Sequence, residues 1–451
     1  MSLEFRYRKT IEWIHGLGRF GSKPGLERIA TLLEMLGNPH HRVRFVHIGG
    51  TNGKGSTAVM LSSILRSAGY SIGLYTSPYL LSFTNRMAVN GSDIDHSELV
   101  ELVDRVRPLV EKISSDQNLG DMTEFEVVTA LALEYFSSKK VDLVVLEVGL
   151  GGRLDATNVV NPLLSVITNI SLEHTAVLGN TIEAIAAEKA GIIKMKKPVL
   201  TAAENQIALK VFKARCRELQ APLYRVYPLQ EKPGKRQKHK PFAMLNEITE
   251  EGQIFTYYGF SLHLENLFIP LRGRYQLSNA ATALAALEIL ANEGFSVDES
   301  VIHRGLSETI WPGRLELLQK KPLVIMDGAH NPAAIEKLAE ALPQYFQYRR
   351  LILVIGILAD KDIAAMLRHI LPLADRIIFT RPVLSRAADP QDVANFATGH
   401  FEMQIESLVI QDHSEALDRA LELAGPEDAV LVTGSLYTVS DIRAYWQRLQ
   451  I

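Results

Sequence analysis

The sequence has little of what marks secreted, membrane-spanning or nucleic-acid-binding proteins. Its single cysteine, Cys216, cannot form an internal disulfide bond, which is typical of a protein in a reducing cytosol. No apolar run approaches the roughly 20 residues needed to span a bilayer. The formal net charge of -3 gives no overall attraction to nucleic acid or to an anionic membrane. We therefore expect a cytoplasmic protein that binds neither nucleic acid nor membrane.

The N-terminal segment also lacks the pattern of a signal peptide, because charged residues interrupt its apolar positions; residues 1–16 predict an amphipathic helix instead. The chain has 451 residues, of which 47% are hydrophobic, and it is too long for one ordinary core. It contains no internal repeat and no low-complexity tract. We therefore expect two domains, covering residues 1–298 and 299–451.

Apolar runs alternate with helical patterns along most of the chain, which predicts an α/β fold with mostly parallel sheets. The expected strands of the first domain are residues 44–48, 71–75, 141–148, 163–170 and 198–202, and its expected helices include 57–68, 124–136, 181–190 and 279–292. Short runs between about residues 224 and 271 predict a small antiparallel appendage, whose basic stretch 232–240 we interpret as a solvated hairpin tip. Strands at 323–326, 351–355, 376–379 and 429–433 predict a second, Rossmann-like α/β domain.

A glycine-rich segment, IGGTNGKGST at residues 48–57, stands between an expected strand and an expected helix. Glycines let successive N–H groups point at phosphate oxygens, and the helix N-terminus adds positive potential. Lys54 would reach the terminal phosphates of a nucleotide. The strict P-loop pattern is not met, because Ile48 and Gly55 occupy two of its key positions. The alternative is a glycine turn with an unrelated lysine, but the strand–loop–helix context favours a phosphate site.

The position after Lys54, which usually supplies a hydroxyl ligand to Mg²⁺, is glycine here, so Ser56 is expected to serve. Further ligands are expected at the carboxyl ends of neighbouring strands, where Ser77, Glu147 and His174 stand. Ser77 could instead cap a turn, and His174 could lie in a surface loop. Glu147, inside the apolar run VVLEVG, would bury a charge at a cost, which favours a functional role.

Lys189 shares a helical stripe with two isoleucines and an alanine in the expected helix 181–190. Its stem could simply run along the core and reach water at its end. Partial burial would instead lower its pKa, and an uncharged amine adds CO₂ to form a carbamate. A carbamylated Lys189 could ligate a second Mg²⁺ beside His174. Spacing alone leaves both interpretations open.

Nine segments together resemble, in order, the Mur ligase superfamily, and within it the folylpolyglutamate synthases and the bifunctional dihydrofolate synthase/folylpolyglutamate synthases. They are GTNGKGST (50–57), TSPYL (76–80), TEFE (123–126), LEVGLGGRLDATN (146–158), EKAGIIK (188–194), WPGRLE (311–316), DGAHNP (327–332), GILADKD (356–362) and GSLYTVSD (434–441).

The resemblance implies roles for individual residues. It implies ATP contacts for Gly53, Lys54, Gly55, Ser56, Thr57, Asn279, Arg314 and Asp327. It implies two Mg²⁺ ions, with ligands among Ser56, Ser77, Glu147, His174 and a carbamylated Lys189. It implies pterin contacts for Lys23, Pro24, Gly25, Leu26, Thr123, Glu124, Phe125, Glu126, Leu154, Asp155 and Ala156. Lys54, His174, Lys189 and His330 are the expected catalytic residues, with His330 near the reacting phosphate.

The implied activity is ATP-dependent ligation of L-glutamate to folates and to dihydropteroate by a monomeric enzyme. The closest alternative is a folylpolyglutamate synthase that does not use dihydropteroate. A cell-wall Mur ligase would need a separate N-terminal uridine-nucleotide domain, whereas about 43 residues precede the first expected strand. A non-ligating P-loop ATPase would need neither a carbamylated lysine nor the DGAHNP segment at 327–332.

Overall fold

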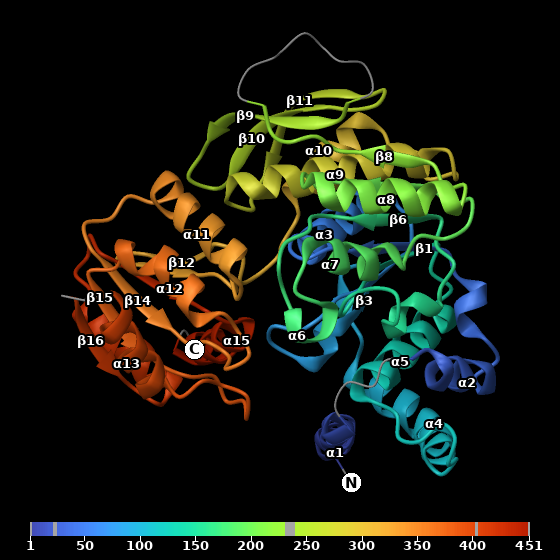
Figure 1. Cartoon of the computed structure of the whole chain (residues 1–451), viewed down its shortest axis with the longest axis horizontal. Coiled ribbons are helices and arrows are strands. Elements are labelled where there is room, and N and C mark those ends of the chain that lie inside the picture. Colours follow the sequence, from blue (N-terminus) through green and yellow to red (C-terminus); the bar gives the residue numbers. More distant parts are fainter. Residues whose placement is uncertain (1, 21–24, 231–239, 402–404, 450–451) are drawn as a thin grey trace. The chain divides into compact units, whose positions relative to one another are not determined.

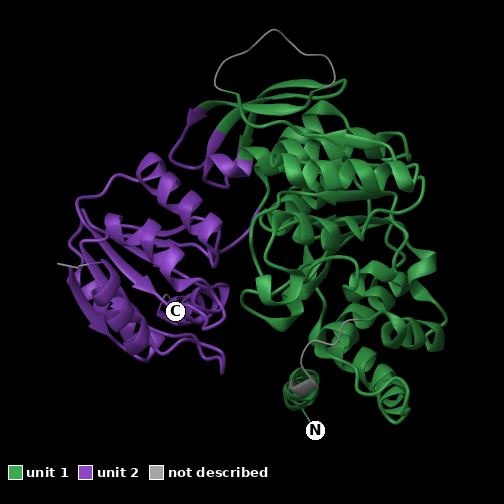
Figure 2. Cartoon of the chain, in the orientation of Figure 1, with its two compact units in different colours: residues 1–246, 254–268, 277–309 green, residues 247–253, 269–276, 310–451 purple. Residues whose placement is uncertain are grey.

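The computed structural model describes residues 2–20, 25–230, 240–401 and 405–449, so the predicted pterin residues Lys23 and Pro24 and most of the basic stretch lie outside the described residues. The chain divides into two compact units (Figure 2). Unit 1 comprises Met1–Asn246, Ile254–Phe268 and Leu277–Thr309, and unit 2 comprises Glu247–Gln253, Ile269–Gln276 and Ile310–Ile451. The division into functional domains at 298/299 stays a prediction. Within the described residues, no helix has both the length and the apolar character that crossing a membrane requires.

Unit 1 is built on an eight-stranded sheet of order β4-β3-β2-β5-β1-β6-β7-β8 (Figure 1). The strands are β1 (Phe45–Gly49), β2 (Ile72–Tyr75), β3 (Met87–Val89), β4 (Ser92–Asp93), β5 (Leu143–Glu147), β6 (Leu164–Ile167), β7 (Val199–Thr201) and β8 (Leu223–Arg225). All pairings from β2 to β8 are parallel, whereas β3 and β4 add an antiparallel edge. The central strand β1 lies between β5 and β6, so the loops that leave these three strands meet at one edge of the sheet.

Helices cover this sheet in three groups. A first group is α1 (Leu3–Gly16), α2 (Glu27–Met35), α4 (His96–Ser114) and α5 (Glu124–Ser138), with the short helices η1 (Leu17–Phe20), η2 (Pro39–Arg42), η3 (Phe83–Arg86) and η4 (Ala156–Val159). Next to β6 and β7 are α6 (Thr175–Leu178), α7 (Ile182–Ala190) and α8 (Gln206–Glu218). The remaining helices are α3 (Lys54–Ser67), α9 (Arg274–Ala291) and α10 (Glu299–Ser307), and α10 packs on α3.

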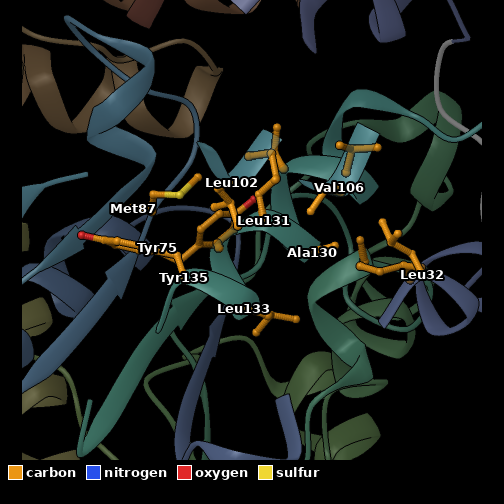
Figure 3. Packing of buried hydrophobic residues seen from close by; sticks show 14 of the residues in the cluster. Leu32, Tyr75, Met87, Leu102, Val106, Ala130, Leu131, Leu133 and Tyr135 are labelled. Atoms are coloured by element: carbon orange, nitrogen blue, oxygen red, sulfur yellow. The ribbon is translucent and has the colours of Figure 1, made fainter. Parts of the chain in front are cut away.

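A large apolar core fixes the first group of helices to the strands (Figure 3). Leu32 of α2, Leu102 of α4, Leu131 of α5 and Tyr75 of β2 belong to it, and all are at most 3% exposed. Burying one such aliphatic side chain stabilises the fold by about 1.5–3 kcal/mol. Because Thr123 caps α5 and exchanges hydrogen bonds with Glu126, the beginning of this helix is also fixed in place.

The predicted appendage is confirmed as a three-stranded antiparallel sheet of order β11-β10-β9. Its strands are β9 (Phe242–Ile248), β10 (Gln253–Tyr258) and β11 (His263–Ile269). The turn before β11 is held by one carboxylate, since Glu288 accepts hydrogen bonds from the backbone N–H groups of Phe260, Ser261 and Leu262.

Unit 2 contains the predicted second α/β sheet, with order β12-β13-β17-β14-β15-β16. The strands are β12 (Glu316–Lys320), β13 (Leu323–Met326), β14 (Leu351–Ile355), β15 (Arg376–Phe379), β16 (Glu406–Val409) and β17 (Ala429–Thr433). The helices are α11 (Pro332–Tyr345), α12 (Ile363–Ile370), α13 (Pro390–Phe401), α14 (His413–Leu423) and α15 (Leu436–Leu449), with the short η5 (Leu371–Leu373). All pairings are parallel except that of the edge strand β12. The predicted fold class is therefore confirmed.

Candidate active site

The glycine loop leaves β1 in a conformation that its glycines make possible. Gly50 and Gly53 have φ angles of 136° and 83°, in the region that favours glycine. A Cβ atom at Gly50 would lie 1.9 Å from Thr168 Oγ1, and one at Gly53 would lie 2.3 Å from Asn279 Oδ1. Substitution of either glycine would therefore force backbone strain and a clash. The predicted ATP residue Asn279 is thus placed directly against the loop.

Neighbouring strand ends hold the loop from outside. Thr168, just after β6, donates its hydroxyl to the carbonyl of Asn52 at 2.7 Å. Asn169 accepts the N–H of Thr51 with its backbone carbonyl at 2.8 Å and the N–H of Asn52 with its side-chain oxygen at 2.9 Å. These contacts pre-form the loop without a ligand.

The first turn of α3 offers donors to an anion. The helix begins at Lys54, and the Thr57 N–H makes a helical bond to the Gly53 carbonyl at 2.9 Å. The N–H groups of Lys54, Gly55 and Ser56 precede it and point out of the helix end. Lys54 Nζ donates to the Thr51 carbonyl at 3.0 Å, so the ammonium group lies over the loop. A helix N-terminus with a lysine above it is a site for phosphate.

Two of the predicted Mg²⁺ ligands meet at the end of β5. Glu147 is only 4% exposed and accepts the backbone N–H of Ser77 at 3.3 Å. Ser56, in the first turn of α3, is also 4% exposed. Across the described ranges, no three His, Cys, Asp or Glu side chains are grouped to hold a metal ion. Glu147 and Ser56 nevertheless carry the oxygen donors that Mg²⁺ prefers.

Lys189 of α7 is buried at 4% exposure, and its Nζ donates to the Gly50 carbonyl of the glycine loop at 2.8 Å. Burial, with a smaller contribution from the charge of Lys54, lowers the pKa of Lys189 to about 7. At pH 8 about nine in ten of such amines are uncharged. The side chain predicted from its helical stripe is therefore buried, close to the loop and nucleophilic.

Close glycine packing brings Lys189 to the loop that follows β5. A Cβ atom at Gly152 would lie 2.9 Å from the Glu188 carbonyl, and one at Gly191 would lie 2.3 Å from Arg153 Cα. The two backbones therefore touch, and the Arg153 N–H bonds to the Glu188 carbonyl at 2.8 Å. This contact explains why the two motifs LEVGLGGRLDATN and EKAGIIK both need glycine.

His174 is the N-cap residue directly before the short helix α6 and has a positive φ of 49°. Its Nε2 lies 3.7 Å from Glu173 Oε1, and the Glu173 side chain is only 8% exposed. Glu173 also acts on Lys189, since its negative charge raises the pKa of that amine against the effect of burial. Glu173 was not predicted, although it stands directly before the predicted ligand His174 in the sequence.

Arg28 connects two of the predicted pterin segments, and the sequence analysis did not identify it. Its Nε donates to Glu126 Oε1 at 2.9 Å, with both side chains almost fully buried. Gly25 and Leu26 directly precede α2, which carries Arg28. The other oxygen of Glu126 accepts the N–H and the hydroxyl of Thr123, both at 2.8 Å. The Glu126 carboxylate is thus already used within the protein.

The other predicted pterin residues lie around the loop after β5. Phe125 is half-buried, and its ring fits against Gly149, where a Cβ atom would lie 2.3 Å from Phe125 Cζ. The beginning of α5 carries a second carboxylate, Glu124, which accepts from Arg86 at 3.3 Å. Leu154 is 36% exposed, whereas Ala156 is buried at 5%. Phe125 and Leu154 thus offer apolar surface, and pterin contact stays a prediction for this set.

Asp155, predicted to contact the pterin, also holds the loop after β5 together by hydrogen bonds. Its Oδ2 accepts the Leu150 N–H at 2.7 Å, and its Oδ1 accepts the Thr157 N–H at 3.0 Å and the Thr157 hydroxyl. Burial raises the pKa of this carboxyl group. Replacement of Asp155 would therefore loosen the loop as well as remove any contact with a substrate.

His47, which the sequence analysis did not single out, stands in the centre of β1 with no exposed surface. Its Nε2 lies 2.8 Å from Thr157 Oγ1, and burial lowers the pKa of His47 to about 3. The imidazole is therefore neutral at every physiological pH. An apolar strand gives no sequence signal that separates such a histidine from a surface one.

The lowered pKa of His47 predicts that the folded protein loses stability in acid. Between pH 6.5 and 3 the unfolded His47 binds a proton and the folded one does not, so stability falls as the pH is lowered through this range. At pH 5 the loss is about 2 kcal/mol. His47→Gln should therefore show a smaller drop than the wild type in the free energy of unfolding, measured with urea at pH 7 and pH 5. Equal drops in the two proteins would contradict the buried, neutral state of His47.

The predicted residues of unit 2 gather at the end of β13. Asp327 is 4% exposed and accepts the N–H groups of Leu315 and Ala329 at 2.7 and 2.8 Å. Burial raises the pKa of Asp327, and the positive charge of Arg314 opposes that rise. The Gly328 carbonyl lies 2.8 Å from His330 Nδ1, which must donate because a carbonyl only accepts. WPGRLE and DGAHNP thus form one folded cluster.

Comparison with known families assigns the chain. The Mur ligase middle domain matches residues 48–287, and the Mur ligase glutamate ligase domain matches residues 313–436. The dihydrofolate synthase/folylpolyglutamate synthase of Bacillus subtilis is 39% identical over 443 residues, which cover 97% of this chain and 98% of that protein. The chain belongs to the Mur ligase family, among the folylpolyglutamate and dihydrofolate synthases.

Solved structures of this branch of the Mur ligase family have the same fold. A Mycobacterium tuberculosis folylpolyglutamate synthase complexed with ADP and AMPPCP has a TM-score of 0.88 at 30% identity and covers 97% of this chain and 98% of its own. Escherichia coli FolC, in complex with DHPP and ADP, has a TM-score of 0.83 at 32% identity and covers 98% of both chains. The resemblance predicted from the nine motifs is confirmed along nearly the whole chain.

Within this Mur ligase, the structure brings together the loop residues, Asn279, Lys189 and the Ser77–Glu147 pair in unit 1. It brings together Arg314, Asp327 and His330 in unit 2. Arg28, His47, Thr157, Asn169 and Glu173 are the site residues that sequence reasoning missed. Arg28, Thr157 and Glu173 contact the predicted residues Glu126, Asp155 and His174, Asn169 holds the glycine loop, and His47 contacts Thr157.

Proposed function

We propose that this protein is an ATP-dependent ligase that joins the amino group of L-glutamate to a carboxylate of folates and of dihydropteroate. The observation that carries the proposal is the buried Lys189, whose Nζ lies 2.8 Å from the Gly50 carbonyl of the glycine loop. A phosphate loop alone serves many reactions, whereas a buried lysine of lowered pKa that contacts this loop suits a ligase of this family. The ADP-bound and AMPPCP-bound relatives support ATP as the nucleotide.

The chemistry requires activation of the acceptor. A carboxylate is a poor electrophile, and transfer of the γ-phosphoryl group of ATP converts it into an acyl phosphate with a good leaving group. Lys54 and the N–H groups of the first turn of α3 would stabilise the charge on the transferring group. The glutamate amine then attacks the acyl carbon, and an amide, ADP and phosphate result.

The residues present fit a Mg²⁺ requirement. Glu147 and Ser56 supply hard oxygen donors at the edge of the sheet where the glycine loop begins. Mg²⁺ would neutralise charge on the phosphates. We propose two ions, the first held by Ser56, Ser77 and Glu147 and the second by His174 and Lys189. The carboxylate of Glu173 next to His174 supports a cation at the second position.

Lys189 fits this second position only after modification, since an ammonium group repels a metal ion. With a pKa of about 7 the amine is about half uncharged at pH 7 and largely uncharged at higher pH, and the uncharged form is the one that reacts with CO₂. The carbamate nitrogen keeps one hydrogen, so the bond to the Gly50 carbonyl would survive the modification. We therefore propose that the active enzyme carries a carbamate on Lys189.

A substrate panel tests the proposed function. The purified enzyme should release ADP in a glutamate-dependent manner with tetrahydrofolate and also with dihydropteroate. Asp155→Ala should reduce dihydropteroate use more than extension of tetrahydrofolate, because the smaller acceptor has fewer other contacts to hold it. Activity with tetrahydrofolate but not with dihydropteroate would support the proposed folylpolyglutamate synthase activity and contradict the proposed dihydrofolate synthase activity. ADP release that ignores glutamate would favour a non-ligating ATPase.

We further propose that the enzyme acts as a cytoplasmic monomer. The single free cysteine, Cys216, supports the cytoplasmic setting. Analytical ultracentrifugation at micromolar concentration should give the mass of one chain, 50.2 kDa. A mass twice as large would contradict the monomer.

A further inference from the structure

His47 occupies the central strand of unit 1, directly before the glycine loop, and it has no exposed surface. In the parallel sheet its backbone is in register with Leu146 on one side and Ser165 on the other. A fully buried imidazole in an apolar strand carries a desolvation cost that an aliphatic residue would avoid. This desolvation cost indicates that the imidazole ring makes a hydrogen bond that offsets it.

The hydrogen bonds around the ring assign its tautomer. The Thr157 hydroxyl has one proton, and it donates that proton to Asp155 Oδ1. The oxygen of Thr157 must therefore accept from His47, whose Nε2 lies 2.8 Å away. His47 is thus protonated on Nε2, and its Nδ1 has no partner in the described part of the chain. The donors run in one direction, from His47 through Thr157 to Asp155.

The far end of this chain holds the loop that leaves β5. Asp155 Oδ2 accepts the N–H of Leu150 at 2.7 Å, three residues after Glu147. Gly149, beside Leu150, is the residue against which the Phe125 ring fits. Asn158, at the end of the same loop, donates to the Arg153 and Gly191 carbonyls at 3.0 and 3.1 Å, which ties the loop to the end of α7.

We propose that His47 is a positioning residue for acceptor binding: through Thr157 and Asp155 it fixes the loop of residues 149–155, so that Phe125 and Leu154 present a preformed surface to the acceptor. The inference rests on the proposed function for its kinetic consequence. Its structural part, in which His47 donates to Thr157, Thr157 donates to Asp155, and Asp155 also accepts the Leu150 N–H, stands without it. The glycine loop has its own supports at Thr168 and Asn169, so ATP binding does not depend on this chain.

Two matched pairs of variants test the proposal in the full-length enzyme. His47→Gln keeps an N–H donor near the position of Nε2, whereas His47→Leu removes it. Thr157→Ser keeps the hydroxyl, whereas Thr157→Val removes it at nearly constant volume. The readouts are the KM for acceptor, the KM for ATP, and hydrogen exchange at the Leu150 amide from overlapping peptides of the ligand-free protein.

His47→Leu and Thr157→Val should each raise the KM for acceptor about ten-fold while the KM for ATP stays within about two-fold. The Leu150 amide should exchange at least about ten-fold faster in both. His47→Gln and Thr157→Ser should behave like the wild type in all three readouts. The double variant His47→Leu/Thr157→Val should be no worse than either single variant, because both break one chain.

The proposal is overturned if His47→Gln and His47→Leu raise the KM for acceptor equally, or if the two KM values rise together. It is also overturned if the Leu150 amide keeps its protection in Thr157→Val. A wild-type enzyme without glutamate-dependent turnover would instead refute the proposed function. In that case hydrogen exchange in the four variants still decides whether the chain from His47 holds the loop.

Discussion

Replacement of Lys54 by alanine should lower ATP-dependent turnover about a thousand-fold or more while the protein stays folded. Lys54 is the first residue of α3, and its Nζ makes one bond to a loop carbonyl, at Thr51. The loop itself is held by Thr168 and Asn169, so its shape does not require the lysine. The substitution removes the positive charge of Lys54, which would stabilise the negative charge on the transferring phosphoryl group.

The measurement is kcat for ADP release with saturating glutamate and tetrahydrofolate, with the circular dichroism spectrum and melting temperature as tests of folding. Lys210→Ala is the matched control, because Lys210 is an exposed lysine of α8 and should leave kcat unchanged. Near-normal turnover by a folded Lys54→Ala enzyme would contradict the proposal that the glycine loop and Lys54 bind the phosphates of ATP.

Lys189→Ala should reduce turnover about a hundred-fold or more, and added acetate or formate should restore part of it. The substitution opens space beside the glycine loop, where the side chain is 4% exposed in the native protein. A short carboxylate can occupy the vacated position and supply the oxygen ligands of the carbamate. For the wild type, reactivation by bicarbonate after CO₂ removal should slow as the pH falls below about 7, because the pKa of Lys189 is about 7 and only its neutral form reacts.

Lys194 provides the control for rescue. It is also partly buried, with a pKa lowered by that burial, but its Nζ donates to the Asn158 carbonyl, away from the glycine loop. Acetate should therefore not rescue Lys194→Ala. A wild-type enzyme whose mass shows no carbamate on Lys189 under bicarbonate, or equal rescue of both variants, would rule out the modification.

Much of the fold was predictable because its signals are local. The buried strands β14 and β17 are largely apolar runs, β1 and β5 are apolar apart from His47 and Glu147, and the glycine loop marks the start of α3. The edge strands β4, β8, β12 and β16 were not predicted, because these short strands contain polar residues and owe their conformation to the strands they pair with. The helix α9 begins at Arg274, five residues earlier than its apolar pattern suggested.

The sequence indicated which residues belong to the site, but it did not indicate the contacts that each of them makes in the folded protein. Lys189 was found because a lysine on an apolar stripe stands out, and its burial follows from the stripe. The contacts of Asp155 and Glu126 depend on how the loop folds back to bring the Leu150 N–H to Asp155, and on Arg28, which comes from a distant segment of the chain. His47 was not singled out, because a histidine can be buried as a neutral ring, whereas the Glu147 carboxylate in an apolar strand signals a buried charge.

The central claim is that ATP activates the acceptor carboxylate for attack by glutamate, and an isotope experiment tests it most directly. Tetrahydrofolate labelled with ¹⁸O in its carboxylates is incubated with enzyme, ATP and glutamate, and the released phosphate is analysed by mass spectrometry. Transfer of the γ-phosphoryl group to the acceptor predicts one ¹⁸O atom in each phosphate released and one added glutamyl residue in each product. Unlabelled phosphate, or phosphate released at the same rate without glutamate, would contradict the proposed ligase mechanism.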